Sequence, residues 1–200
     1  MIEAQSNLPR LIRALGDSAL RETAATEIFT RGCELARPVV EQWLADEEFA
    51  CCVAFGPTQA PKQTVGLAVD ADNFERIRAA FGSPPLAHVP PDQDALEFEI
   101  ECAAGVRLDI LTTRQPASTG AIARFLRKFG EGIQQIELLV KSVDTATHIV
   151  RARFGITPLF PATRPGADAT RVNFFLVPIP AGGKVLIELV EAKAPPRSLC

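Results

Sequence analysis

The chain has 200 residues, of which 47% are hydrophobic and 22% are charged. These values are ordinary for a globular protein with one large domain or two small ones. The net charge of −3 and the isoelectric point near 5.5 argue against a general nucleic-acid surface, which is normally basic. The sequence has neither an apolar run long enough to span a bilayer nor the pattern of a signal peptide. We therefore expect a soluble cytoplasmic protein without membrane or nucleic-acid partners.

The five cysteines are an odd number and include no CxxC pair, the spacing typical of metal and redox sites. Most of them lie in apolar runs, where a thiol behaves as a small hydrophobic side chain. We expect buried or spectator thiols in a reducing compartment.

Residues 1–58 form a first region, in which the spacing of apolar residues predicts three helices. The first helix ends at Gly16, the second ends near Gly32, and the third begins near Pro38. Two short helices, a tight turn and a third helix resemble a HEAT-type repeat fragment. Because so short a fragment cannot bury a core alone, we expect it to pack against the rest of the chain.

Residues 63–192 form a second region, in which the apolar pattern changes. Its first part, residues 63–116, predicts a βαβββ module. Residues 95–102 alternate strictly, with three glutamates on one face and apolar side chains on the other. The expected elements are a strand at 64–70, a helix at 72–82, and strands at 86–89, 95–102 and 106–112.

Residues 132–192 repeat the order of the first module after a linking helix at 118–130. Ile77-Arg78-Ala79 and Phe81-Gly82 have counterparts within 149–155, and such a duplication usually means two units that share one structure. The expected elements are a strand at 135–140, a helix at 143–154, strands at 156–163, 170–177 and 184–191, and a tail at 193–200. The predicted fold is α+β, with two βαβββ modules that form a curled mixed sheet behind a short helical N-terminal region.

Three stretches resemble methylmalonyl-CoA epimerases, which are vicinal-oxygen-chelate (glyoxalase/bleomycin-resistance) proteins. TVGLAVDADNFERI is similar to their opening strand and helix, GAIARFLRKFGEGIQQIELLV to their linking helix and fifth strand, and RVNFFLVPIPAGGKVLIELVE to their last hairpin. The likeness covers residues 63–192 and nothing in residues 1–60. It implies a glyoxalase-like fold with a cup-shaped small-molecule site, and isomerase or lyase chemistry on an acyl or carbonyl substrate.

The family binds a divalent metal with four side chains, one on each of four inward-facing strands. Carried over position by position, the resemblance places Thr64 and Gln135 where the family has histidines. It places Asp109 and Glu188 where the family has its remaining ligands. Imidazole suits zinc, cobalt and nickel, whereas oxygen ligands suit magnesium, manganese and calcium. Asp109, Gln135 and Glu188 would thus make at most a weak all-oxygen metal site, and a metal-free cup is the favoured expectation.

Strand alternation predicts which side chains line the cup. The expected cup face carries Thr64, Arg107, Asp109, Gln135, Glu137, Arg171, Asn173, Phe175, Lys184 and Glu188, with Glu97, Glu99 and Glu101 nearby. The two arginines beside acidic groups favour a small polar or anionic ligand, such as a carboxylate or phosphate. Glu188 is the candidate general base, because burial and neighbouring carboxylates would raise its pKa.

Three functions stay open at this stage. The first is an enzyme of the epimerase or glyoxalase type that acts through Glu188. The second is a metal-free module that binds a ligand without turnover, as resistance proteins of the same superfamily do. The third is an interaction protein that works through its N-terminal helices, which an exposed apolar patch around Trp43 and Leu44 would support. The family often pairs, so a homodimer is compatible with each of them.

Overall fold

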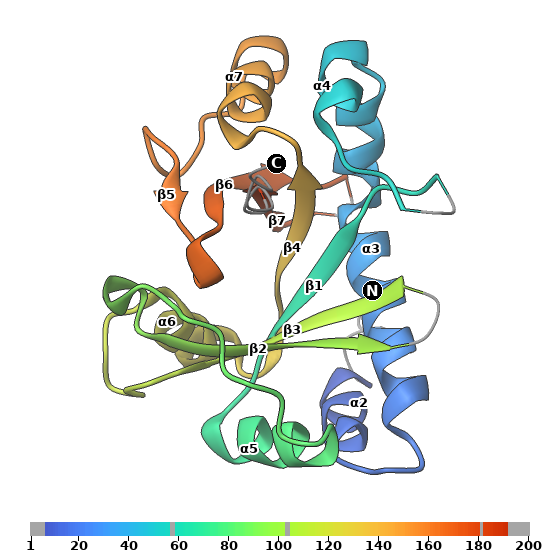
Figure 1. The fold of residues 1–200 in the computed structure, drawn as a ribbon, viewed down its shortest axis with the longest axis vertical. Helices are drawn as coiled ribbons and strands as arrows, with labels where there is room; N and C mark the ends of the chain where they lie inside the picture. The colour runs from blue at the N-terminus through green and yellow to red at the C-terminus, as the bar shows by residue number, and fades with distance from the viewer. Residues whose placement is uncertain (1–6, 57–58, 103–104, 181, 192–200) are drawn as a thin grey trace, which may run out of the picture.

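The computed structural model describes residues 7–56, 59–102, 105–180 and 182–191 (Figure 1). The predicted tail at 193–200 and part of the turn after residue 102 lie outside the described residues. The described part of the N-terminal region contains three helices: α2 (Leu8–Leu15), α3 (Arg21–Leu44) and α4 (Glu47–Cys52). None of the described helices is both long enough and apolar enough to cross a membrane.

The long helix α3 corrects the expectation of a break between Gly32 and Pro38. Gly32 does not end the helix but lies where the helix touches the sheet. A Cβ atom at this position would lie 2.5 Å from Val65 Cγ2 and 3.0 Å from Ile136 Cδ1. Pro38 lies inside the helix, although it cannot donate the usual backbone hydrogen bond. The buried side chains that surround this turn hold the helix together through tertiary packing.

The second region builds one seven-stranded sheet in the order β2-β3-β1-β4-β7-β6-β5. Its strands are β1 (Gln63–Ala68), β2 (Ala95–Cys102), β3 (Val106–Thr113), β4 (Gly132–Val140), β5 (Arg164–Pro165), β6 (Arg171–Pro178) and β7 (Lys184–Glu191). β1 is parallel to β3, β4 is parallel to β7, and the two halves join through the antiparallel pair of β1 and β4. This is the predicted curled mixed sheet of an α+β fold.

Three further helices accompany the sheet: α5 (Ala71–Ala80), α6 (Ala121–Phe129) and α7 (Val143–Phe154). α5 begins where the Asp70 side chain accepts a hydrogen bond from the Asn73 backbone N–H at 2.8 Å. α7 begins at Ser142, which accepts from the Thr145 N–H in the same way, and it ends at Gly155 with φ of 67°. All three helices lie close to the predicted positions.

Two predicted strands are wrong. Residues 86–89 form no strand. A single backbone hydrogen bond, from the Ala87 N–H to the Glu97 carbonyl, joins them to β2. Residues 156–163 are also irregular, and the short strand β5 follows them. Two prolines flank the first segment on each side, at 84–85 and 90–91, and Pro158 and Pro161 lie within the second. Proline lacks the N–H that a ladder requires.

The hydrophobic core lies between the outer face of the sheet and the helices. Val65, Leu67, Ile136, Ile187 and Leu189 are fully buried on this face, as alternation predicts. Figure 1 shows α3 running beside the strands, from α2 and α5 at the lower end to α4 and α7 at the upper end. The opposite, inner face of the sheet is therefore free to form a cup.

Trp43 joins the N-terminal helices to this core. Its side chain is fully buried, and its ring centroid lies 5.4 Å from that of Phe49 and 5.7 Å from that of Phe175 on β6. Leu44 also packs against the core. The apolar patch that would have supported an interaction protein is thus absent at these two residues.

Candidate functional site

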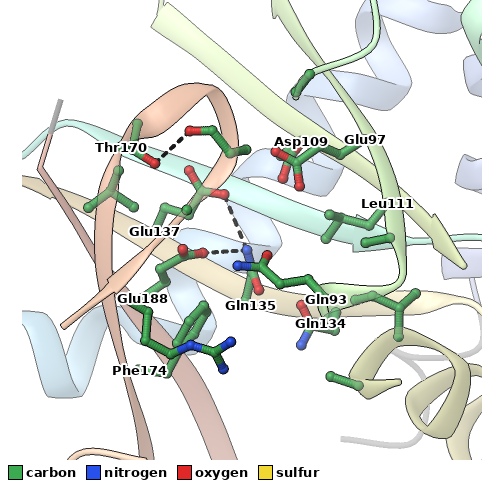
Figure 2. Close-up of a pocket in the computed structure, with 18 of the residues that line it drawn as sticks. Gln93, Glu97, Asp109, Leu111, Gln134, Gln135, Glu137, Thr170, Phe174 and Glu188 are labelled. Carbon is green, nitrogen blue, oxygen red and sulfur yellow. Dashed lines mark hydrogen bonds between the residues drawn. The ribbon is translucent and has the colours of Figure 1, made fainter. Parts of the chain in front are cut away.

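The inner face of the sheet encloses a cavity of about 820 Å³ (Figure 2). Its floor carries polar side chains from four strands: Glu97 on β2, Asp109 on β3, Gln135 and Glu137 on β4, and Glu188 on β7. Strand register brings these residues together, because Gly66 pairs with both Asp109 and Gln135, and Glu137 pairs with Glu188.

Gly66 provides the space that Gln135 needs. A Cβ atom on Gly66 would lie only 2.5 Å from Gln135 Cγ and 3.3 Å from its Cδ. Gln135 can therefore lie across the middle of β1, and a glycine inside a strand often marks such a close approach.

The amide group of Gln135 links two carboxyl groups of the floor. Its Nε2 donates to Glu188 Oε2 at 2.5 Å and, more weakly, to Glu137 Oε1 at 3.3 Å (Figure 2). A donated hydrogen bond favours the ionised form of the carboxyl group that accepts it. Gln135 thus orients the two carboxyl groups and opposes the repulsion between them.

Burial raises the pKa of every carboxyl group on the floor. The pKa of Glu97 rises to about 7, first because of burial and then because of the charges of Glu137, Asp168 and Glu99. Burial, followed by the neighbouring carboxylates, also raises the pKa of Asp109 well above its usual range.

The same causes act on the other two carboxyl groups. Burial and then the charges of Glu137 and Glu97 raise the pKa of Glu188 well above its usual range. The pKa of Glu137 also rises through burial, against the hydrogen bond from Gln135. The cluster therefore keeps its protons to a higher pH than ordinary carboxyl groups do.

The residues of the cup do not fit the divalent metal that the family resemblance implies. In the part of the chain that the structure describes, no group of three or more His, Cys, Asp or Glu side chains could hold a metal ion. Gln135 turns its amide nitrogen, which is a donor and not a ligand, toward Glu137 and Glu188. No histidine lines the cavity. The chemistry of this cup is therefore derived from its carboxyl groups.

Four of the predicted cup residues come together: Asp109, Gln135, Glu137 and Glu188. Thr64 is buried beside Glu137 in the sheet register but does not line the cavity. The remaining predictions need correction.

Arg107 and Arg171 both lie outside the cavity lining. Arg107 pairs with Glu99 through Nη2 and Oε1 at 2.6 Å. Arg171 turns to the helix side of the sheet, where it pairs with Asp144 of α7 at 2.6 Å. The prediction of an anionic ligand rested on these two arginines, and neither of them points a free guanidinium into the cup.

The remaining errors come mostly from β6. Phe174 of this strand pairs with Glu188 and faces the cup, so Asn173 and Phe175 face the helices instead. Asn173 is fully buried and donates to the Phe160 carbonyl at 3.3 Å. Lys184, at the start of β7, is exposed and also lies outside the cavity lining.

Sequence reasoning missed the loops that complete the cup. Residues 84–93 and 159–170 come from opposite ends of the sheet and both line the cavity. They meet where the His88 N–H donates to Asp168 Oδ1 at 2.8 Å and the Asp168 N–H donates to the His88 carbonyl at 3.1 Å. An ion pair between Arg164 and Asp92 adds a second link. Irregular loops carry no periodic signal, so this junction could not be found from the sequence.

The described cysteines take no part in the cup. Cys33, Cys51, Cys52 and Cys102 are free thiols, and none of them lines the cavity. Burial raises the pKa of Cys33 to about 11, which leaves this thiol protonated and unreactive.

Comparison with known proteins gives structural neighbours only. No protein-family model and no curated protein sequence matches the chain. Methylmalonyl-CoA epimerase from Mycobacterium tuberculosis is similar, with a TM-score of 0.53 and 29% identity over 66% of this chain and 87% of that chain. A hypothetical protein from Bacillus halodurans C-125 has a TM-score of 0.53 and 25% identity over 66% and 94% of the two chains.

A third neighbour is a Streptomyces coelicolor methylmalonyl-CoA epimerase variant in complex with 2-nitronate-propionyl-CoA. It has a TM-score of 0.51 and 25% identity over 66% of this chain and 93% of that chain. The resemblance predicted from the sequence is thereby confirmed. The chain has the vicinal-oxygen-chelate fold and is similar in structure to methylmalonyl-CoA epimerases.

Proposed function

We propose that the chain is an isomerase or lyase that moves a proton at a carbon atom beside a carbonyl group. The supporting observation is that four carboxyl groups, from four different strands, surround one cavity and have raised pKa values. Acid–base catalysis is most effective when the pKa of the catalytic group lies near the working pH. The pKa of Glu97, at about 7, meets this condition.

Such a reaction needs a base for the proton and a donor for the oxygen that becomes negative. Glu188 is the proposed base, because Gln135 orients its carboxyl group by a hydrogen bond and because its raised pKa makes the ionised carboxylate a stronger base. Asp109 is the proposed donor, because a buried carboxyl group that keeps its proton can donate a hydrogen bond to a developing enolate oxygen. Return of a proton by Glu188 would restore the original configuration, so an epimerisation would need a second carboxyl group of the floor to deliver a proton to the opposite face of the enolate.

The structural neighbours support an acyl thioester as the first substrate class to examine. One of them is described as bound to 2-nitronate-propionyl-CoA, which is an acyl-CoA analogue. The cavity of about 820 Å³ is large enough to take a small acyl group together with part of its carrier.

Exchange of the proton beside the carbonyl group tests the proposal without knowledge of the natural substrate. The protein is incubated in D₂O with propionyl-CoA, 2-methylbutyryl-CoA, 3-aminopropionyl-CoA and methylmalonyl-CoA, and deuterium at the carbon next to the carbonyl is measured by mass spectrometry. We expect enzyme-dependent exchange in at least one compound, and a loss of at least about 100-fold with Glu188→Gln.

The matched control is Glu101→Gln, the same substitution on β2 at a residue outside the cavity lining. This variant should exchange at the wild-type rate. The proposal is wrong if no compound exchanges above the rate without protein, or if Glu188→Gln exchanges as fast as the wild type.

A further inference from the structure

The charge of the cavity lining limits which ligands can enter. Among the described residues that line the cavity, seven are acidic and two, Arg124 and Arg164, are basic. Both arginines already have partners: Arg124 donates to the Thr119 carbonyl at 2.6 Å, and Arg164 pairs with Asp92. A negative charge placed among these carboxyl groups would raise their pKa values further, whereas a cation would stabilise their ionised forms.

The hydrogen-bonding groups of the floor point to the same kind of ligand. Nε2 of Gln135 is occupied by Glu188 and Glu137, so it is not available to a ligand that only accepts hydrogen bonds. The carboxyl groups of the floor are therefore the groups left to contact a ligand.

The aromatic wall adds an independent observation. Phe160 and Phe174 both line the cavity, with ring centroids 6.0 Å apart. The guanidinium group of Arg164 lies 4.4 Å from the centroid of the Phe160 ring, so one organic cation already rests on this wall. Phe174 lies directly opposite Glu188 in the register of β6 and β7. An aromatic ring beside a carboxyl group is a favourable site for an ammonium group.

We infer that the ligand of the cup carries a protonated amine, which binds between the floor carboxyl groups and the aromatic wall. A carboxylate in the same place is rejected. Methylmalonyl-CoA, which carries a carboxylate and is bound to one of the structural neighbours, is therefore expected to be a poor ligand for this chain. The inference rests on the proposed function only in that both use the same cup. Amine binding can hold without turnover.

Three probes of one shape test this inference: 3-methylbutylamine, 3-methylbutanol and 3-methylbutanoate. Their affinities are measured at pH 7.5 by NMR titration of the ¹⁵N-labelled full chain. We expect the amine to bind at least about tenfold more tightly than the alcohol, and the carboxylate to bind more weakly than the alcohol. Glu137→Gln should bring the affinity of the amine close to that of the alcohol, while Glu101→Gln should leave both unchanged.

The inference is overturned if the amine does not bind, if the carboxylate binds as tightly as the amine, or if Glu137→Gln leaves the amine affinity unchanged. If Glu137→Gln does not fold, Glu97→Gln removes a second carboxyl group of the floor and serves the same comparison. The two proposals fail separately. Amine binding without any deuterium exchange would overturn only the proposed enzyme activity. Faster exchange of methylmalonyl-CoA than of 3-aminopropionyl-CoA would overturn only the proposed preference for an amine.

Discussion

At the scale of single residues, the site depends on contacts that no sequence pattern reveals. The resemblance to epimerases pointed to Asp109, Gln135 and Glu188, and strand register does bring these residues together. Alternation placed Glu97 on the same face. The hydrogen bond from Gln135 to Glu188 and the raised pKa values arise from burial and distance, which exist only in the folded chain.

The contact between Gly66 and Gln135 gives a first prediction. Gly66→Ala would place a Cβ atom 2.5 Å from Gln135 Cγ, so the glutamine must move and release Glu188. We expect a loss of about 1–3 kcal/mol in the free energy of unfolding, measured by urea denaturation, because overpacking forces side chains away from their preferred positions. Gly56→Ala is the control, since the nearest atom to its Cβ would be the Ala60 carbonyl oxygen at 3.7 Å. Equal stability of both variants would contradict this account.

Glu97 gives a second prediction, concerning pH. Its pKa is about 7 in the folded chain, above the usual 4.5, so the folded state binds more protons than the unfolded state between these values. Stability must then fall as pH rises from about 4.5 to 7, by up to about 3 kcal/mol for this group. Glu97→Gln should remove this contribution and be more stable than the wild type at pH 8 but not at pH 4.5. Urea denaturation at the two pH values measures the difference, and a pH-independent difference would exclude the raised pKa.

At the scale of elements, prediction succeeded where the polar pattern is periodic. β4 and β7 place Ile136 and Ile187 on the core face as alternation predicts. The prediction of which face each β6 side chain occupies was wrong. The apolar run of β6 does not alternate, and the polar Asn173 was therefore assigned to the wrong face of the sheet. The prediction of a break in α3 was wrong because glycine and proline were interpreted as signals of helix ends. Gly32 instead allows a close contact between α3 and the sheet.

The packing of α3 on the sheet gives a third prediction. In a helix interior, Gly→Ala normally adds stability of about 0.5–1 kcal/mol, because alanine restricts the unfolded chain. At Gly32 the added Cβ atom would instead lie 2.5 Å from Val65 Cγ2. We expect Gly32→Ala to lower the free energy of unfolding by about 1–3 kcal/mol, as overpacking does. Thermal denaturation followed by circular dichroism measures the effect, and a higher melting temperature would show that α3 does not press on the sheet.

At the scale of the whole molecule, one core unites the N-terminal helices and both halves of the sheet. Buried residues of α2, α3 and α4 belong to the same hydrophobic cluster as those of β1, β4 and β7. The helices support the outer face of the sheet, while the inner face and the two loops that join at His88 and Asp168 enclose the cup. The general fold could be predicted from the sequence, but the loops and the course of α3 depend on contacts between distant segments.

This shared core gives a fourth prediction. A chain that begins at residue 45 lacks α2 and α3, so Val65, Ile136 and their neighbours lose their cover. We expect such a chain to aggregate or to unfold cooperatively below about 40 °C, because a large apolar face would be exposed. Circular dichroism and size-exclusion chromatography check this. A stable, monomeric truncated chain would mean that the second region folds independently.

The carboxyl groups of the cup keep their protons to a higher pH than ordinary carboxyl groups do. The most direct measurement follows the side-chain carboxyl ¹³C resonances of Glu97, Asp109, Glu137 and Glu188 by NMR between pH 3 and pH 9, assigned with the single Gln and Asn variants. We expect a pKa of about 7 for Glu97 and raised pKa values for the other three groups. Titration of all four groups near their ordinary pKa of about 4 would contradict this expectation.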